Sequence, residues 1–211
     1  MKPIIAGALI CAALVTLCVL YVDRPVASFV AAHDGYLLFY DALASPSLLA
    51  LPFACVYAVI HTQRTLAGRP QSAHADLLLA LTIAIAFAAM AKDELKWLIG
   101  RPWPQTWVKY GVYALKPFTD SQYFGSFPSG HTTYVAAPMF VLWWRLPRYR
   151  PLWLGIVLMV MIGLVGSNNH FVADVIAGFF LGLAAAAGTV GMMPEGKKVL
   201  FLKKKIQKDF Y

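Results

Sequence analysis

Six long apolar runs decide what this sequence can fold into. They cover residues 3–22, 44–61, 76–95, 130–146, 151–168 and 171–193. Each is close to the roughly 20 residues that a helix needs to cross the hydrocarbon core of a bilayer. The chain is 60% hydrophobic and only 13% charged, about half the charged fraction of an ordinary soluble domain. The sequence therefore predicts an all-α, polytopic membrane protein with six transmembrane helices in one bundle.

The remaining residues add little besides charge. We expect one membrane domain over residues 1–195 and a basic cytoplasmic tail over residues 196–211. The formal net charge is +8, but the basic residues lie beside the apolar runs, as they do when they set membrane topology. We therefore expect contact with membrane lipids and no nucleic-acid partner, and the sequence leaves the oligomeric state unknown.

The distribution of basic residues predicts an orientation. If the N-terminus is cytoplasmic, twelve of the 18 Lys and Arg residues fall on the inner side, six of them in the tail. The other six inner residues are Lys2, Arg64, Arg69, Arg145, Arg148 and Arg150. Because cytoplasmic loops carry an excess of Lys and Arg, both termini are predicted to be cytoplasmic. The expected location is a bacterial inner membrane, with the opposite loops in the periplasm.

With this orientation, every polar cluster of interest falls on the outer face. The clusters are "KDELKWLIGRPWP" after the third run, "FPSGHTT" before the fourth and "SNNHFVAD" between the last two. In the second cluster, Ser129 is a good helix N-cap and Gly130 permits close approach to the backbone. Such a helix N-terminus holds anions, and His131 beside it exchanges protons near neutral pH.

The third cluster contains a second histidine with a carboxylate. His170 and Asp174 are four residues apart, on one face of a helix, so the carboxylate can fix the imidazole tautomer. Lys96 supplies positive charge, whereas Lys92 is interpreted as an interfacial lysine with acidic neighbours. Two histidines, a lysine and a helix N-terminus fit phosphoryl transfer through a phosphohistidine. No carboxylate cluster suits magnesium ions, so no metal and no cofactor are expected.

These residues, in this order, carry a family resemblance. Lys96 to Pro104, "PSGH" at 128–131 and His170 with Asp174 resemble the type 2 phosphatidic acid phosphatase superfamily, which includes vanadium haloperoxidases and glucose-6-phosphatase. The resemblance covers roughly residues 75 to 190 and implies the integral membrane branch of lipid phosphatases. It also implies roles: His170 as nucleophile, Asp174 as its orienter, His131 as general acid, and Lys96, Ser129 and Gly130 as phosphate-binding residues.

Two arginines of the family pattern are replaced. The pattern K-x6-R-P places Trp103 where its arginine belongs, and S-R-x5-H-x3-D places Leu164 there. Losing one such donor typically costs about 10² to 10³ in rate. Arg101, in the same Pro-rich segment, is predicted to turn inward and bind the phosphate. Asn168 and Asn169 are expected to offer further neutral donors.

The leading prediction is a phosphatase that hydrolyses a lipid phosphate or diphosphate on the outer face. Phosphatidate, a polyprenyl diphosphate, phosphatidylglycerol phosphate and a lipid A phosphate all remain possible substrates. The alternatives are a phosphotransferase with the same intermediate, and a catalytically weak or silent protein that binds a lipid phosphate. A haloperoxidase is disfavoured because vanadate binding needs the same guanidinium groups. The aromatic loop 105–126 is either an interfacial lid or an aromatic belt.

Overall fold

The computed structural model describes residues 2–72 and 74–193, and the regular elements in these residues are helices. The basic tail expected at 196–211 lies outside the described residues. The expectation of an all-α protein is confirmed. The α-helices are α1 (Lys2–Leu17), α2 (Asp23–Ala32), α3 (Leu37–Ala44), α4 (Ala50–Leu66), α5 (Ala75–Ile99), α6 (Pro104–Tyr110), α7 (Gly130–Arg145), α8 (Arg150–Gly166) and α9 (Val172–Met192).

Five helical stretches are long and apolar enough to cross a membrane. They are Ile5–Ala32, Leu37–Leu66, Ala75–Ile99, Pro147–Gly166 and Val172–Met192. The helix expected at 130–146 forms as α7, but its 16 residues span only about 24 Å at 1.5 Å per residue. The count of six transmembrane helices therefore depends on whether this shorter, central helix also spans the bilayer.

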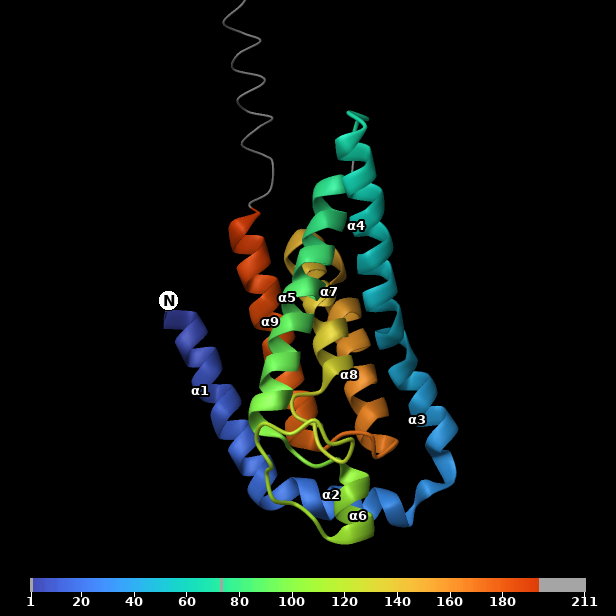
Figure 1. Ribbon diagram of the computed structural model, residues 1–211, viewed down its shortest axis with the longest axis vertical. Coiled ribbons are helices and arrows are strands. Elements are labelled where there is room, and N and C mark those ends of the chain that lie inside the picture. Colours follow the sequence, from blue (N-terminus) through green and yellow to red (C-terminus); the bar gives the residue numbers. More distant parts are fainter. Residues whose placement is uncertain (1, 73, 194–211) are drawn as a thin grey trace, which may run out of the picture.

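The first two apolar stretches extend beyond the runs expected from the sequence. A π-helical turn, Cys18–Val22, leads α1 into α2, which lies across one end of the bundle (Figure 1). In the second stretch, a 3-10 segment, Ser45–Leu49, joins α3 to α4. Pro46 lies in that segment and Pro52 in the first turn of α4, where the missing N–H is tolerated. The prolines therefore shape this stretch without ending it.

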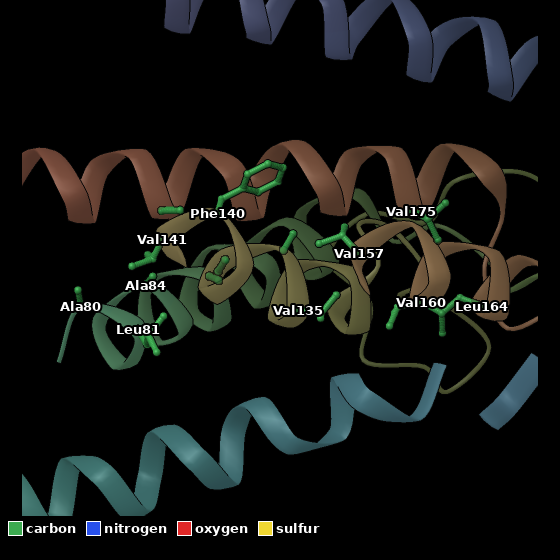
Figure 2. Packing of buried hydrophobic residues seen from close by; sticks show 14 of the residues in the cluster. Ala80, Leu81, Ala84, Val135, Phe140, Val141, Val157, Val160, Leu164 and Val175 are labelled. Atoms are coloured by element: carbon green, nitrogen blue, oxygen red, sulfur yellow. The ribbon is translucent and has the colours of Figure 1, made fainter. Parts of the chain in front are cut away.

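Helix α7 is the centre of the bundle and packs against α5, α8 and α9 (Figure 1). Its buried side chains include Val135, Phe140 and Val141. Figure 2 shows them among buried residues of the neighbouring helices, namely Ala80, Leu81, Ala84, Val157, Val160, Leu164 and Val175. This apolar core fixes the ends of α5, α7, α8 and α9 relative to one another.

Small residues let α9 approach α7 closely. A Cβ atom at Gly178 would lie 2.6 Å from the Ser129 carbonyl oxygen, and one at Gly182 would lie 2.5 Å from Ala136 Cβ. This four-residue spacing is the small-xxx-small pattern of close membrane helix pairs. As a result, the Ser129 N–H donates to the Asp174 carbonyl across the two helices at 3.0 Å.

The turn between α8 and α9 is as tight as the sequence predicts for Gly166 to Asn169. Asn168 adopts a left-handed backbone conformation with φ of 56°, which asparagine tolerates better than most residues. The Leu164 carbonyl accepts from the N–H groups of Asn169 and His170, at 3.0 and 3.1 Å. These bonds cap α8 and place His170 at the end of the bundle near α2 and the loops.

Candidate active site

The two histidines singled out in the sequence lie together. His131 is in the first turn of α7 and His170 directly precedes α9. Their ring centroids are 6.2 Å apart. His170 is only 4% exposed, and this burial lowers the pKa of its imidazole below the ordinary value. A buried imidazole with a low pKa stays neutral at physiological pH, which is the form that attacks phosphorus.

Asp174 lies behind His170, as expected from their spacing. Its Oδ2 atom is 3.5 Å from His170 Nδ1 and accepts the Phe171 N–H at 3.0 Å. The distance between the carboxylate and the ring exceeds that of a well-formed hydrogen bond. The carboxylate is completely buried, and its other oxygen, Oδ1, accepts from Arg101 Nη1 at 2.5 Å.

Arg101 turns inward, but its guanidinium contacts carboxylates. Besides Asp174, it donates from Nη2 to Asp23 Oδ2 at 2.5 Å and to the Tyr113 hydroxyl at 2.7 Å. The Phe171 ring covers one side, with its centroid 4.4 Å from Cζ. Burial alone lowers the pKa of Arg101, but the two carboxylates outweigh it and raise the pKa above its ordinary value. This arrangement differs from the expected contact with a substrate phosphate.

Asp23 is a site residue that the sequence analysis missed. It is 1% exposed, and its Oδ1 atom accepts the N–H of Ala173 at 3.0 Å. Ala173 is the second residue of α9, so Asp23 caps that helix from α2 and meets the positive end of its dipole. The sequence did offer a signal for Asp23, because an ionisable residue at the end of an apolar run is a candidate functional residue.

Gly100 directs Arg101 into the bundle. It ends α5 in the left-handed region, with φ of 55°, and a Cβ atom there would overlap the Lys116 carbonyl. The Arg101 carbonyl then accepts from the N–H groups of Gly125 and Ser126, at 2.7 and 3.0 Å. Only glycine fits this combination of conformation and close contact. The Arg101 segment is therefore fixed to the chain that leads into α7.

Two lysines of α5 face the site. Lys96 lies with its Nζ 4.9 Å from the centroid of the Trp103 ring and donates to the Gly125 carbonyl. Lys92, which the sequence analysis set aside, is 9% exposed and packs its stem against Gly130, where a Cβ atom would lie 3.0 Å from Lys92 Cδ. Its ammonium also donates to Asp93. The sequence signal for Lys92 was its four-residue spacing from Lys96, which puts both lysines on one face of the helix.

Ser129 caps α7 as predicted. Its hydroxyl accepts the Thr132 N–H at 3.3 Å, and its carbonyl accepts the Thr133 N–H at 3.0 Å. Its side chain is completely buried, so any phosphate at this helix end meets the amides of Gly130 and His131. These amides belong to the first helical turn, where N–H groups have no partner within the helix.

The two positions that hold arginine in the family pattern are occupied by apolar side chains. Trp103 lies beside His170, with the two ring centroids 5.2 Å apart. Leu164 is 2% exposed in the apolar core. Its neighbour Gly163 lets α3 approach, because a Cβ atom there would lie 2.6 Å from the Tyr40 carbonyl oxygen. The side chains that replace the two arginines therefore have packing roles. Trp103 forms a wall of the site, and Leu164 fills the core.

The neutral donors expected from the two asparagines are used elsewhere. The Asn168 side-chain amide donates to the Ala27 carbonyl at 3.2 Å. The Asn169 amide donates to the Ser167 hydroxyl at 2.8 Å and to Asp41 at 3.3 Å. Both asparagines connect the turn before His170 to its surroundings, so the structure does not support their expected role as phosphate donors.

Two recesses adjoin the site. One, of about 220 Å³, is lined by Trp103, Gln105, Thr106, Lys109, Tyr110, Gln122 and Tyr123. The other is an apolar groove of about 620 Å³ between α1 and α9 that reaches Phe127 and Pro128. Within residues 2–72 and 74–193, no three His, Cys, Asp or Glu side chains converge in a way that suits a metal ion.

Comparison with known proteins identifies a family and two relatives that this chain resembles. Residues 75–198 match the PAP2 superfamily. Lipid A 1-phosphatases of Rhizobium johnstonii and Rhizobium etli are each 36% identical over 108 residues, which is 48% of this chain and 42% or 44% of the relative. The match thus spans less than half the length of either relative.

A solved structure supports the fold. The chain resembles a transmembrane PAP2 type phosphatidylglycerolphosphate phosphatase from Bacillus subtilis, with a TM-score of 0.59 and 21% identity. The similarity covers 91% of this chain and 96% of the other. At this identity, the likeness bears on the fold alone.

Proposed function

The chain belongs to the PAP2 superfamily, and on that premise we propose that it is a membrane-embedded phosphatase that acts on a lipid phosphate or diphosphate through a phosphohistidine. One observation carries the proposal: His131 and His170 meet at one end of the bundle, with Asp174 behind the second histidine. The retained lysine, Lys96, lies within the same cluster.

The geometry supports a division of roles between the histidines. Asp174 faces Nδ1 of His170, so Nε2 is the nucleophilic atom. Its attack forms an N–P bond while the P–O bond to the lipid breaks, and His131 donates a proton to the departing oxygen. His131 then takes a proton from water, the water oxygen attacks phosphorus, and the N–P bond breaks. Phosphate leaves and both histidines return to their starting state.

Positive charge comes from lysines in place of the missing arginines. Lys96 and Lys92 lie one turn apart on α5, beside the N-terminus of α7. Their ammonium groups and the first amides of α7 stabilise the negative charge that develops on the phosphoryl oxygens. Arg101 does not contact the phosphate in this proposal, because its guanidinium is already paired with two carboxylates. It contributes indirectly, by holding Asp174 in position.

The headgroup lies beside Trp103 in this proposal. The recess of about 220 Å³ there presents Gln105, Gln122 and Tyr123, side chains that bond hydroxyl and amide groups. Two relatives are named lipid A 1-phosphatases. A lipid A 1-phosphate is therefore the first substrate to assay, ahead of phosphatidate, phosphatidylglycerol phosphate and a polyprenyl diphosphate.

The deciding experiment compares purified wild type with His170→Ala for phosphate release from these lipids. We expect wild type to release phosphate from at least one lipid and His170→Ala from none. The alternative of a silent lipid-phosphate binder is favoured by Trp103 and Leu164 at the arginine positions. If wild type binds these lipids but releases no more phosphate than His170→Ala, the binder replaces the phosphatase.

The proposed topology has six spans, including α7, with both termini in the cytoplasm and the site in the periplasm. The support is the excess of Lys and Arg on the opposite side. Single cysteines at Thr119 and Arg148, in a variant lacking Cys11, Cys18 and Cys55, test it. An impermeant thiol reagent should label position 119 and not 148 in intact cells. Labelling of 148 alone would place the site on the cytoplasmic face.

A further inference from the structure

Helices α1 and α9 run alongside each other at the edge of the bundle (Figure 1), and an apolar groove lies between them. Its volume is about 620 Å³, within the range of ligand pockets. Small residues line part of each wall, with Gly7, Ala8 and Ala12 on α1 and Ala177, Ala184 and Ala187 on α9, and larger apolar side chains such as Phe180 and Trp144 complete the lining. The small side chains leave space between the two helices unfilled.

Small residues have opposite effects on the two faces of α9. On the face toward α7, a Cβ atom at Gly178 would come within 2.6 Å of the neighbouring backbone, so the helices are in direct contact. On the other side of α9, across the groove on α1, a Cβ atom at Gly7 would meet nothing within 4 Å. The groove is therefore open space, and small side chains keep it open.

The length of the groove matches one leaflet of a bilayer. From Ala177 to Ala187, ten helical steps of 1.5 Å give about 15 Å. This is half of the roughly 30 Å hydrocarbon core. The groove is thus deep enough for an acyl chain that starts at one membrane surface and ends near the midplane.

One end of the groove reaches the segment that leads into the candidate site. Phe127 and Pro128 line it, and they directly precede Ser129, the cap of α7. We propose that the α1–α9 groove holds one acyl chain of the lipid phosphate while its phosphate lies between His131 and His170. This inference rests on the proposed phosphatase function and adds the place of the lipid tail.

The groove acts by positioning the substrate. Lipid tails are as apolar as the side chains that line the groove, so moving a chain from the bilayer into it yields little hydrophobic free energy. Its effect is to align the phosphorus with His170, and misalignment by about 1 Å costs up to about 10² in rate. Filling the groove should therefore lower kcat/KM for long-chain lipids selectively.

Two neighbouring alanines of α1 give a matched test. Ala12 lines the groove, whereas Ala13 does not and is exposed on the outer side. We expect Ala12→Phe to lower kcat/KM for a long-chain lipid phosphate at least about tenfold. Activity on a water-soluble phosphate ester should change less than about twofold, and Ala13→Phe should match wild type on both substrates. Equal behaviour of the two variants on the long-chain lipid would overturn the proposal.

Position along the groove provides a second comparison. Ala184 lies nearer the site end than Ala187, so Ala184→Phe should exclude shorter chains than Ala187→Phe does. The expected result is a lower chain-length limit for Ala184→Phe, measured over lipid phosphates with one headgroup. Identical chain-length profiles for the two variants would contradict a chain lying along α9.

A binding experiment separates this proposal from the proposed catalysis. A non-hydrolysable lipid phosphonate with a photoreactive group at its chain end is bound to His170→Ala protein and irradiated. We expect crosslinks in α1 and α9 near Gly7 and Ala187, displaced by excess unlabelled phosphonate. Crosslinks to the exposed faces of α4, or crosslinks in the groove that excess phosphonate does not displace, indicate surrounding lipid or a second copy and refute the proposal. A protein without phosphatase activity that still crosslinks there refutes only the proposed catalysis.

Discussion

The two sides of the His170 imidazole are built differently. On one side, which we call the holding side, Asp174, Arg101 and Asp23 are at most 3% exposed and joined by short hydrogen bonds. On the other, the substrate side, His131, Lys96 and Trp103 are half-buried around the ring. Charge is paired and enclosed on the holding side, and accessible on the substrate side.

This difference explains how a chain without the family's two arginines retains a coherent site. Its inward-facing arginine, Arg101, pairs with Asp174 behind His170, since a buried charge needs partners. The cations that face the substrate are lysines, which are compact point charges on flexible stems. Changes on the holding side should therefore alter kcat and folding stability, whereas changes on the substrate side should alter substrate binding and leaving-group dependence.

The largest effect is expected from His131, the proposed general acid on the substrate side. His131→Ala should lower kcat/KM for a lipid phosphate by about 10² to 10⁴. The loss should shrink with a nitrophenyl phosphate, because this leaving group departs without a proton. Steady-state kinetics with both esters measure the effect. An equal loss with the two esters would remove His131 from the role of acid.

The lysine nearest His170 should come next. Lys96→Ala removes the charge that we propose stabilises the phosphoryl oxygens, and we expect kcat/KM to fall about 10² to 10³, with KM rising as well. Lys116→Ala, which removes an exposed lysine of the loop between α6 and α7, is the control and should stay within about twofold of wild type. If Lys96→Ala resembles this control, the charge must come from another group.

On the holding side, Arg101→Ala should lower kcat about 10² with KM nearly unchanged. The substitution leaves Asp23 and Asp174 buried without their shared cation, which typically costs 3–5 kcal/mol of unfolding free energy, to an order of magnitude. Kinetics and thermal unfolding are measured together, with Arg101→Lys as the variant that keeps the charge. A higher KM at unchanged kcat would instead mean that Arg101 contacts the substrate.

The smallest effect is expected from Asp23. Asp23→Asn keeps an acceptor for the Ala173 N–H and leaves Arg101 paired with Asp174, so kcat should fall only about tenfold. KM should not change, because Asp23 lies on the far side of Arg101. Asp120→Asn, an exposed change in the loop between α6 and α7, serves as control. A drop in kcat as large as that of Arg101→Ala would show that the pair acts as one unit.

The sequence predicted the parts of the site that lie close together along the chain. His170 with Asp174, and Ser129 with His131, follow from helical spacing and capping preferences. The contact between these segments was also predictable, because membrane helices with loops on one side bring their ends together. The family pattern drew attention to Trp103, whose ring lies beside that of His170.

Long-range pairing was not predictable. Asp23 meets Arg101 only because α2 crosses the end of the bundle after a π-helical turn, and neither feature has a clear pattern in the sequence. Lys92 was set aside as an interfacial lysine with acidic neighbours, and it does pair with Asp93. Periodicity shows that it shares a face with Lys96 but not that this face meets Gly130. Both cases depend on how helices pack rather than on the residues of one helix.

Trapping the covalent intermediate tests the central claim most directly. Enzyme is mixed with a lipid phosphate carrying a radiolabelled phosphoryl group and quenched in alkali, in which a phosphohistidine survives. We predict label on His170 in wild type, label in His131→Ala with an activated ester, and none in His170→Ala. Label that persists in His170→Ala, or turnover in wild type without any labelled histidine, would contradict the account.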